Sequence, residues 1–223
     1  MEIEIALSKY YYKYLKYKKK YLEIGNLENS NIFAKKDGIE YDKLIITDEG
    51  KYSITKRKDG EKLLEIIKKE IKTTEDKTIT DLTGCVGGDT ILFGLNFKKV
   101  YSIEYNNNNY KALENNVKKV YNLENVKLFH GDSTQIYNWK TDVLYLDPPW
   151  GGVNYKEKNR IDLYLGDIRV DIFLDKILER ENRPKYIFLK LPRNYNFDRL
   201  YKLKNKIKIR NYTIRGYNII FIK

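Results

Sequence analysis

The fold is decided by residues 78–90, which read TITDLTGCVGGDT. The β-branched residues at the start of this run, closed by Asp81 and Leu82, are typical of a strand, and the apolar stretch that follows the run through Leu95 is typical of a helix. Glycines at 84, 87 and 88 lie between the two, where they let the backbone approach a ligand closely. The run therefore predicts a nucleotide-binding unit at the carboxyl end of a strand.

Strand and helix signals continue to alternate along the chain as far as residue 191. Strands are predicted at residues 100–103, 126–129, 142–146 and 186–191, and helices at residues 61–71, 108–121 and 167–178. Residues 206–212 and 215–222 alternate in polarity around a turn, which predicts an antiparallel pair. We therefore expect a doubly wound, Rossmann-like α/β sheet that ends in a terminal antiparallel β pair.

A second decisive stretch, residues 145–152, reads YLDPPWGG and follows the predicted strand 142–146. Pro148 and Pro149 lack a backbone N–H and restrict φ, so this turn presents carbonyl acceptors, and the Asp147 carboxylate adds another. Trp150 offers a π face on which a base can stack, above all a cationic one. The stretch predicts chemistry on the exocyclic amino group of a base, whereas in the simpler interpretation Trp150 is an ordinary core aromatic.

The tetrapeptide DPPW resembles the catalytic signature of S-adenosylmethionine-dependent amino-methyltransferases. With the two glycines after it, the stretch resembles the trimethylguanosine synthase family, which methylates N2 of the 7-methylguanosine cap of RNA. Three further motifs are similar to that family in the same order: residues 41–55, the glycine loop, and the LPRN run at residues 191–194. The resemblance covers residues 41–194 and departs from the family at Lys56 and Arg57, where the family has Pro and Glu.

The resemblance implies S-adenosyl-L-methionine as cofactor, bound within a class I methyltransferase domain. Glu104 ends the second predicted strand, at a spacing from the glycine loop that suits a carboxylate accepting from both ribose hydroxyls. Asp132 follows the third strand, where class I methyltransferases carry an acidic residue that accepts from the adenine amino group. The expected cofactor-binding residues are Asp81, Thr83, Gly84, Gly87, Gly88, Glu104, Asp132 and Asp147.

The same resemblance assigns roles on the substrate side. It implies that Asp147, Pro148 and Trp150 are catalytic. Tyr155 lies in a run similar to the family's Asp-Tyr, whose tyrosine contacts cap phosphate, and Arg193 offers a forked donor to phosphate oxygens. The expected substrate-binding residues are Trp150, Tyr155, Arg193 and Asn194, and the expected partner is RNA capped with 7-methylguanosine.

The composition sets further limits. The net charge of +12 and a pI near 9.4 favour a polyanionic partner, although A/T-rich coding, as in some viruses, also explains the abundance of Lys, Asn, Ile and Tyr. One cysteine and one histidine exclude an internal disulfide and a cysteine metal cluster, and argue against a histidine-based triad, so we expect no metal. Without a bilayer-spanning apolar run or a signal-like start, we expect a monomeric protein of the nucleus or cytoplasm, with no membrane partner.

The start of the chain is expected to differ from the rest. Residues 6–23 have helical spacing, with leucines and tyrosines on one side and lysines elsewhere. This helix either packs through its leucine and tyrosine stripe or faces RNA. We expect an N-terminal helical extension and cap-side segment at residues 1–55, and a methyltransferase domain at residues 56–223.

Two other functions remain open on the sequence. One is an adenine-N6 or guanine-N2 methyltransferase that acts inside RNA or DNA, since such enzymes use similar tetrapeptides. Tyr155 and Arg193 favour the cap over that alternative. The other is a non-catalytic RNA-binding subunit with this fold, against which the presence of Asp81, Glu104 and Asp147 together argues.

Overall fold

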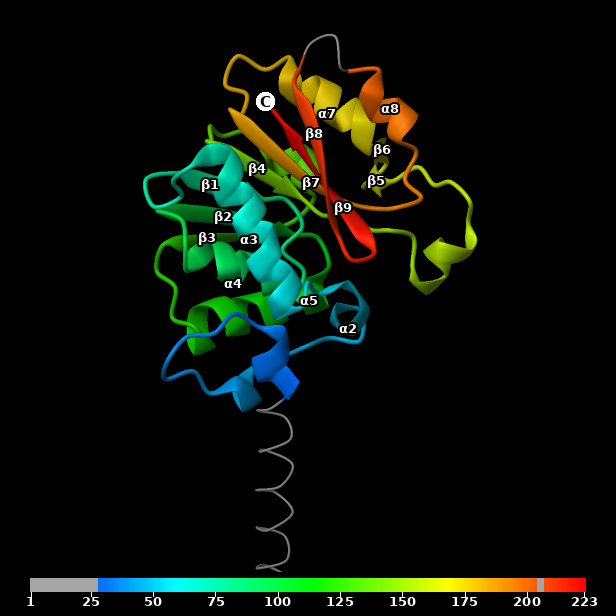
Figure 1. The fold of residues 1–223 in the computed structure, drawn as a ribbon. Helices are drawn as coiled ribbons and strands as arrows, with labels where there is room; N and C mark the ends of the chain where they lie inside the picture. The colour runs from blue at the N-terminus through cyan, green and yellow to red at the C-terminus, as the bar shows by residue number, and fades with distance from the viewer. Residues whose placement is uncertain (1–27, 204–206) are drawn as a thin grey trace, which may run out of the picture.

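The computed structural model describes residues 28–203 and 207–223 and contains a central sheet of seven strands (Figure 1). The helix predicted at residues 6–23 lies outside the described residues. The strand order is β3-β2-β1-β4-β7-β9-β8. The bounds are β1 (Thr78–Asp81), β2 (Lys99–Glu104), β3 (Val126–His130), β4 (Val143–Leu146), β7 (Tyr186–Pro192), β8 (Ile209–Ile214) and β9 (Tyr217–Ile222).

Strands β3, β2, β1, β4 and β7 are parallel, and β9 pairs antiparallel with both β7 and β8. The predicted doubly wound α/β sheet with a terminal antiparallel pair is therefore confirmed. β1 lies between β2 and β4, so the strand order reverses beside it. In open α/β sheets, ligands bind at the carboxyl ends of the strands at such a reversal.

Helices cover both faces of the sheet, and side chains on neighbouring positions of a strand enter different cores. Tyr145 packs in the cluster that includes helices α3 and α4, whereas Leu144 and Leu146 pack in the cluster that includes α7. This alternation follows from the two-residue period of a strand. The helix bounds are α2 (Gly50–Ser53), α3 (Arg57–Ile71), α4 (Gly88–Gly94), α5 (Asn107–Glu114), α6 (Ser133–Ile136), α7 (Val170–Leu178) and α8 (Phe197–Tyr201).

Three predicted helices differ from the structure in their bounds, and the one expected at residues 61–71 begins earlier, at Arg57. The helix expected at residues 167–178 begins only at Val170, because β5 (Tyr164–Leu165) and β6 (Ile168–Arg169) form a small hairpin around Gly166, whose φ of 56° suits a tight turn. The helix expected at residues 108–121 is α5 followed by one wider π turn, η2 (Asn115–Val120).

The described part of the N-terminal segment packs onto the sheet domain. Its 3-10 turn η1 (Tyr41–Lys43) and helix α2 precede α3, and Phe33 is fully buried in the main core. Asn116 in η2 donates to the backbone carbonyls of Ile45 (2.7 Å) and Val86 (2.8 Å). The segment reaches the glycine loop at Thr55, whose carbonyl oxygen lies 3.3 Å from the position that a Cβ on Gly88 would take. The predicted division at residue 55 stays a prediction.

Candidate active site

The two motifs singled out in the sequence meet at the carboxyl ends of β1 and β4. These strands pair in parallel, with Asp81 beside Tyr145. The backbone N–H of Asp147 donates to Thr83 Oγ1 at 3.0 Å, so the glycine loop and the DPPW turn are directly bonded. The parallel pairing thus brings residues more than sixty positions apart into one site.

The glycines of the loop are required by close packing within the protein. A Cβ on Gly84 would lie 2.4 Å from Ser102 Oγ, and Gly84 N donates to the carbonyl of Ile103 at 2.8 Å. A Cβ on Gly88 would lie 2.7 Å from Ile54 Cγ1, and Gly87 has a φ of 100° at the start of α4. The loop is therefore held tightly between β2 and the N-terminal segment, with its backbone at the strand ends.

Asp81 holds this loop through hydrogen bonds to residues at its two ends. Its carboxylate is fully buried and accepts from Thr90 Oγ1 at 2.6 Å and from the backbone N–H of Thr83 at 3.1 Å. Burial raises the pKa of Asp81 to about 7, against the opposing hydrogen bond from Thr90. Among the predicted cofactor residues, Asp81 is thus placed to hold the loop.

Glu104 lies at the end of β2 and faces the same loop. Its Oε2 accepts from Cys85 N and its Oε1 from Asn106 N, both at 2.7 Å. Each carboxylate oxygen can accept two hydrogen bonds, so the carboxylate keeps acceptor capacity beside these two donors and the side chain of Asn109. Burial raises the pKa of Glu104, and the two backbone N–H groups oppose that rise. The arrangement suits a pair of neighbouring hydroxyls.

Asp132 begins α6 and is held by that helix. Its Oδ1 accepts from the N–H and from the hydroxyl of Thr134, each at 2.8 Å. Its Oδ2 lies 3.0 Å from the position that a Cβ on Gly166 would take, at the tip of the β5–β6 hairpin. The hairpin therefore lies against the residue predicted to accept from adenine.

Asp147 is paired with a residue that the sequence analysis did not single out. Its Oδ2 accepts from the ammonium of Lys190 at 2.6 Å, and its Oδ1 accepts from Trp150 Nε1 at 3.1 Å. Lys190 is in the middle of β7 and only 5% exposed. The ammonium also lies 5.5 Å from the Trp150 ring centroid and 5.1 Å from that of Tyr217.

This pair continues into a buried polar network. The ammonium of Lys190 donates to Thr55 Oγ1 at 2.9 Å, and Thr55 Oγ1 donates to Asp89 Oδ2 at 2.7 Å. The hydroxyl of Tyr145 also donates to Asp89 Oδ2, at 2.9 Å. Within the described residues, Asp89 Oδ1 is buried without a hydrogen-bond partner, as is the hydroxyl of Tyr217. These two atoms leave acceptor and donor capacity beside the DPPW turn.

The two charges of the central pair stabilise each other. Burial raises the pKa of Asp147 to about 6, although Lys190 opposes the rise through its charge and its hydrogen bond. Burial lowers the pKa of Lys190, but the carboxylates of Asp147 and Asp89 outweigh that effect and leave it raised. At neutral pH the pair is therefore ionised, with Asp147 as an acceptor.

Of the other residues predicted to bind substrate, only Tyr155 is in direct contact with the Trp150 ring. Tyr155, in η3 (Val153–Glu157), makes an edge-to-face contact with Trp150 at 5.0 Å between centroids. Asn194 donates to the carbonyls of Tyr155 and Lys158, both at 2.8 Å, so it holds that segment to the end of β7. Arg193 is exposed and donates to the carbonyl of Arg215.

The sequence contained one signal for the missed lysine. Lys190 interrupts the apolar run YIFLKLP of residues 186–192, all of which the structure buries. A charged side chain inside a buried strand requires a partner, because an unpaired buried charge is costly. Thr55, Asp89 and Tyr217 carry no comparable signal, since their role depends on neighbours from other elements.

The site fits the cofactor that the resemblance implies. The Glu104 carboxylate keeps acceptor capacity for a ribose diol, and Asp89 Oδ1, unpartnered within the described residues, is a buried acceptor for an amino group. Both lie next to the glycine loop. Among residues 28–203 and 207–223, no group of three or more His, Cys, Asp or Glu side chains is arranged to hold a metal ion. In the same residues no helix has the length and apolar character needed to cross a bilayer.

Comparison with known sequences identifies related proteins. A family model described as RNA cap guanine-N2 methyltransferase matches residues 76–221. Uncharacterized protein L320 of Acanthamoeba polyphaga mimivirus is 36% identical over 149 residues, which cover 65% of this chain and 57% of that protein. The match therefore spans little more than half the length of the viral relative.

Solved structures share the fold. A precorrin-6y C5,15-methyltransferase from Geobacter metallireducens superposes with a TM-score of 0.58 at 14% identity, covering 82% of this chain and 94% of its own. A human methyltransferase 10 domain containing protein gives 0.58 at 13% identity, over 80% and 88% of the two chains. A 16S rRNA N2 G1207 methyltransferase from T. thermophilus, solved with AdoMet and guanosine, gives 0.58 at 16% identity, over 74% and 42%. At these identities the likeness concerns the fold alone.

Proposed function

Because the chain belongs to the RNA cap guanine-N2 methyltransferase family and is thus an S-adenosylmethionine-dependent RNA methyltransferase, we propose that it methylates N2 of the 7-methylguanosine cap. The observation that carries the proposal is the Asp147 carboxylate, held ionised by Lys190 and bonded to the half-buried ring of Trp150. An acceptor and an aromatic ring in this arrangement suit an amino group on a stacked base. The place of the protein in the cell and its monomeric state stay predictions.

Asp147 and Trp150 act mainly by positioning the purine. Asp147 and the Pro148 carbonyl accept the two hydrogens of the N2 amino group, so the nitrogen lone pair is directed toward the cofactor side of the site. S-adenosylmethionine supplies an electrophilic methyl group when bound. Correct positioning lowers a barrier without a strong general base, and the proton of the methylated nitrogen can leave to water.

One face of Trp150 is already in contact with protein. The Lys190 ammonium and the Tyr217 ring approach Trp150 from the buried side, so a base is expected to stack on the opposite face. A 7-methylated guanine is cationic and should stack there better than guanine by about 1–2 kcal/mol. Tyr155 at the ring edge and the exposed Arg193 are the candidates for contacts with cap phosphates.

The substrate is tested by incubating the protein with S-adenosylmethionine and either 7-methyl-GTP or GTP and measuring product mass. We expect methylation of 7-methyl-GTP and little of GTP. Trp150→Ala should remove that preference, while Trp150→Phe, which keeps a π face but loses the hydrogen bond to Asp147, should retain part of it. Arg193→Ala should weaken binding of the triphosphate more than that of 7-methylguanosine. Equal wild-type activity on both nucleotides would reject the cap and favour an internal amino group.

The cofactor role of Glu104 is tested by calorimetry. Glu104→Ala should weaken S-adenosylmethionine binding by about 1.5–3 kcal/mol, because a charged acceptor for hydroxyls is lost. Since Glu104 also accepts from Cys85 N and Asn106 N on different oxygens, Glu104→Gln is the milder control, because its one amide oxygen can accept from one of these two groups while the charge is lost. A folded Glu104→Ala protein with normal cofactor affinity would remove Glu104 from the site.

A further inference from the structure

One face of the sheet at β2 and β3 lacks the helix that a doubly wound fold normally places there. The connections from β1 to β2 and from β4 to β7 contain α4 and α7, whereas the β3–β4 connection contains one helix of four residues, α6. On this side β2 and β3 are covered instead by Trp139, from the loop after α6, whose ring lies 5.2 Å from Tyr101 and 4.7 Å from Phe129.

The same face carries lysines interleaved with these rings. The ammonium of Lys99 lies 4.9 Å from the Tyr101 centroid, and that of Lys127 lies 5.1 Å from the Phe129 centroid. Both lysines are exposed, and the three rings are half-buried. We call these five residues, Lys99, Tyr101, Lys127, Phe129 and Trp139, the lysine–aromatic face.

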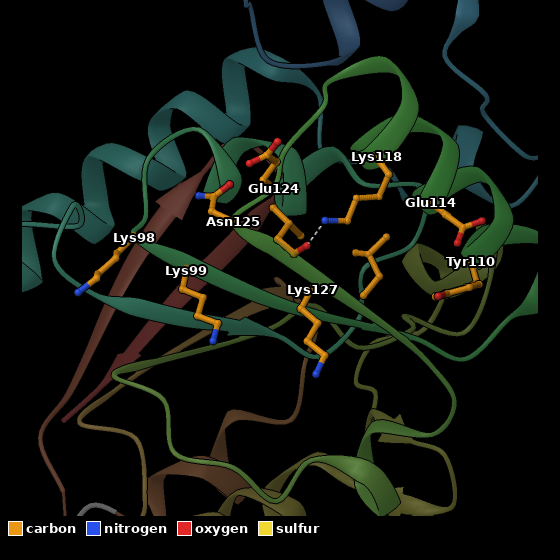
Figure 2. Close-up of a pocket in the computed structure, with 10 residues that line it drawn as sticks. Lys98, Lys99, Tyr110, Glu114, Lys118, Glu124, Asn125 and Lys127 are labelled. Carbon is orange, nitrogen blue, oxygen red and sulfur yellow. Dashed lines mark hydrogen bonds between the residues drawn. The ribbon is translucent and has the colours of Figure 1, made fainter.

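The charge on this face is of one sign. Lys99 and Lys127 also line a pocket that contains Glu114 and Glu124, but Figure 2 shows the two lysines pointing to one side of the sheet and the two glutamates on the other side. Each ammonium group lies over a ring, a weak attraction at an exposed site that favours its position and so reduces the side-chain entropy that is lost when an anion binds. The face is therefore a prepared site for anions.

The spacing of the two lysines fits neighbouring charges on one chain. Lys127 is paired in register with Tyr101, which is two residues from Lys99 along β2. With a rise of about 3.3 Å per residue and about 4.8 Å between strands, the two positions are roughly 8 Å apart. Successive phosphates of a single strand can contact both lysines.

We propose that the lysine–aromatic face binds the single-stranded RNA chain of the substrate, outside the site that holds the methylated base. The proposal uses the family's action on RNA and does not require that the target be a cap. β3 is an edge strand, and its carboxyl end lies beside that of β2 with Glu104, so an RNA chain along β3 leads toward the cofactor site. The face thus adds affinity for RNA over a free nucleotide.

The test measures binding of a fluorescent single-stranded 20-nucleotide RNA, with a 7-methylguanosine cap or a 5′-triphosphate, at several salt concentrations. Lys99→Glu/Lys127→Glu should lower affinity for both RNAs by about tenfold or more and reduce the salt slope by about 1.4, as expected for two lost phosphate contacts. The KM for the free methyl-accepting nucleotide should not change. Lys99→Arg/Lys127→Arg should bind RNA as the wild type does.

The matched control is Lys62→Glu/Lys176→Glu, which reverses two exposed lysines on α3 and α7. It should lower RNA affinity much less than the face variant. An equal loss in the control would show that net charge alone binds RNA and would overturn the proposal. Unchanged RNA affinity in a folded Lys99→Glu/Lys127→Glu protein would also overturn the proposal. This holds even if that variant has altered self-association. Because capped RNA and 5′-triphosphate RNA are compared, a lack of preference for the cap can be distinguished from a lack of RNA binding by the lysine–aromatic face.

Discussion

Asp147→Ala is expected to lower kcat by about 10²–10⁴-fold while changing the affinity for the nucleotide substrate little. The carboxylate accepts from the target amino group most strongly when that group develops positive charge, so its removal affects the transition state more than the ground state. Single-turnover rates and substrate Kd values, measured with saturating S-adenosylmethionine, separate the two effects.

The control for Asp147→Ala deals with Lys190. Without Asp147 the buried ammonium loses its charged partner, which is destabilising, so thermal unfolding must be measured for each variant. Asp147→Ala/Lys190→Met removes both charges and should be as inactive as the single variant although better folded. Near-normal turnover in any folded variant lacking Asp147 would show that backbone carbonyls suffice and would refute the assigned role.

Lys190→Met is expected to shift the acidic limb of the pH–rate profile upward. In the wild type, activity should rise as pH rises through about 6, the pKa of Asp147. Above that pH the carboxylate is ionised, and the ionised form is the one that accepts a hydrogen bond from the substrate amino group. Lys190 lowers that pKa by charge and by hydrogen bond, so its loss should move the midpoint up by about 1–3 units. At neutral pH the variant should be slow, and it should recover at alkaline pH.

Other groups around Asp147 also affect its pKa and remain in the variant. Asp89 on α4 raises the pKa of Asp147 through its charge, and the Trp150 N–H lowers it. The carboxyl of Asp81 and the hydroxyls of Tyr145, Tyr155 and Tyr217 also interact with the Asp147 charge. Removal of Lys190 therefore leaves burial and acidic neighbours largely unopposed.

The pH profile distinguishes this role from a purely structural one. If Lys190 only supported the fold, Lys190→Met would lower the rate by the same factor at every pH, and the midpoint would stay near that of the wild type. Lys190→Arg is the matched variant, since it keeps the positive charge and should keep the wild-type midpoint even if the larger guanidinium lowers the rate. A constant midpoint in Lys190→Met would reject the assignment.

The sequence predicted the sheet correctly because its signals are local. The strand at residues 78–82 and the helix after the glycine loop follow from side-chain pattern over a few positions, and the alternation of such units implies a doubly wound sheet. The helix expected from residue 167 began at Val170 because a turn at Gly166 forms a hairpin of only two residues per strand, too short to leave a pattern.

The order of motifs in the chain also determined which residues gather at the site. The last residue of each parallel strand lies at the carboxyl edge of the sheet. The predicted strands therefore imply that Asp81, Glu104 and Asp147 lie at the same edge. What each of them does there was not determined. The structure uses Asp81 to hold Thr83 and Thr90, whereas Glu104 keeps acceptor positions facing the loop.

Only the tertiary structure decided the charge state of Asp147. The pairing of Asp147 with Lys190 depends on the parallel register of β4 and β7, and the link to Asp89 depends on Thr55 packing over the glycine loop. Those contacts join segments 43 and 135 residues apart. Because burial and a paired charge set a pKa jointly, and both arise from residues distant in the chain, the sequence named Asp147 while the fold determines when it is ionised.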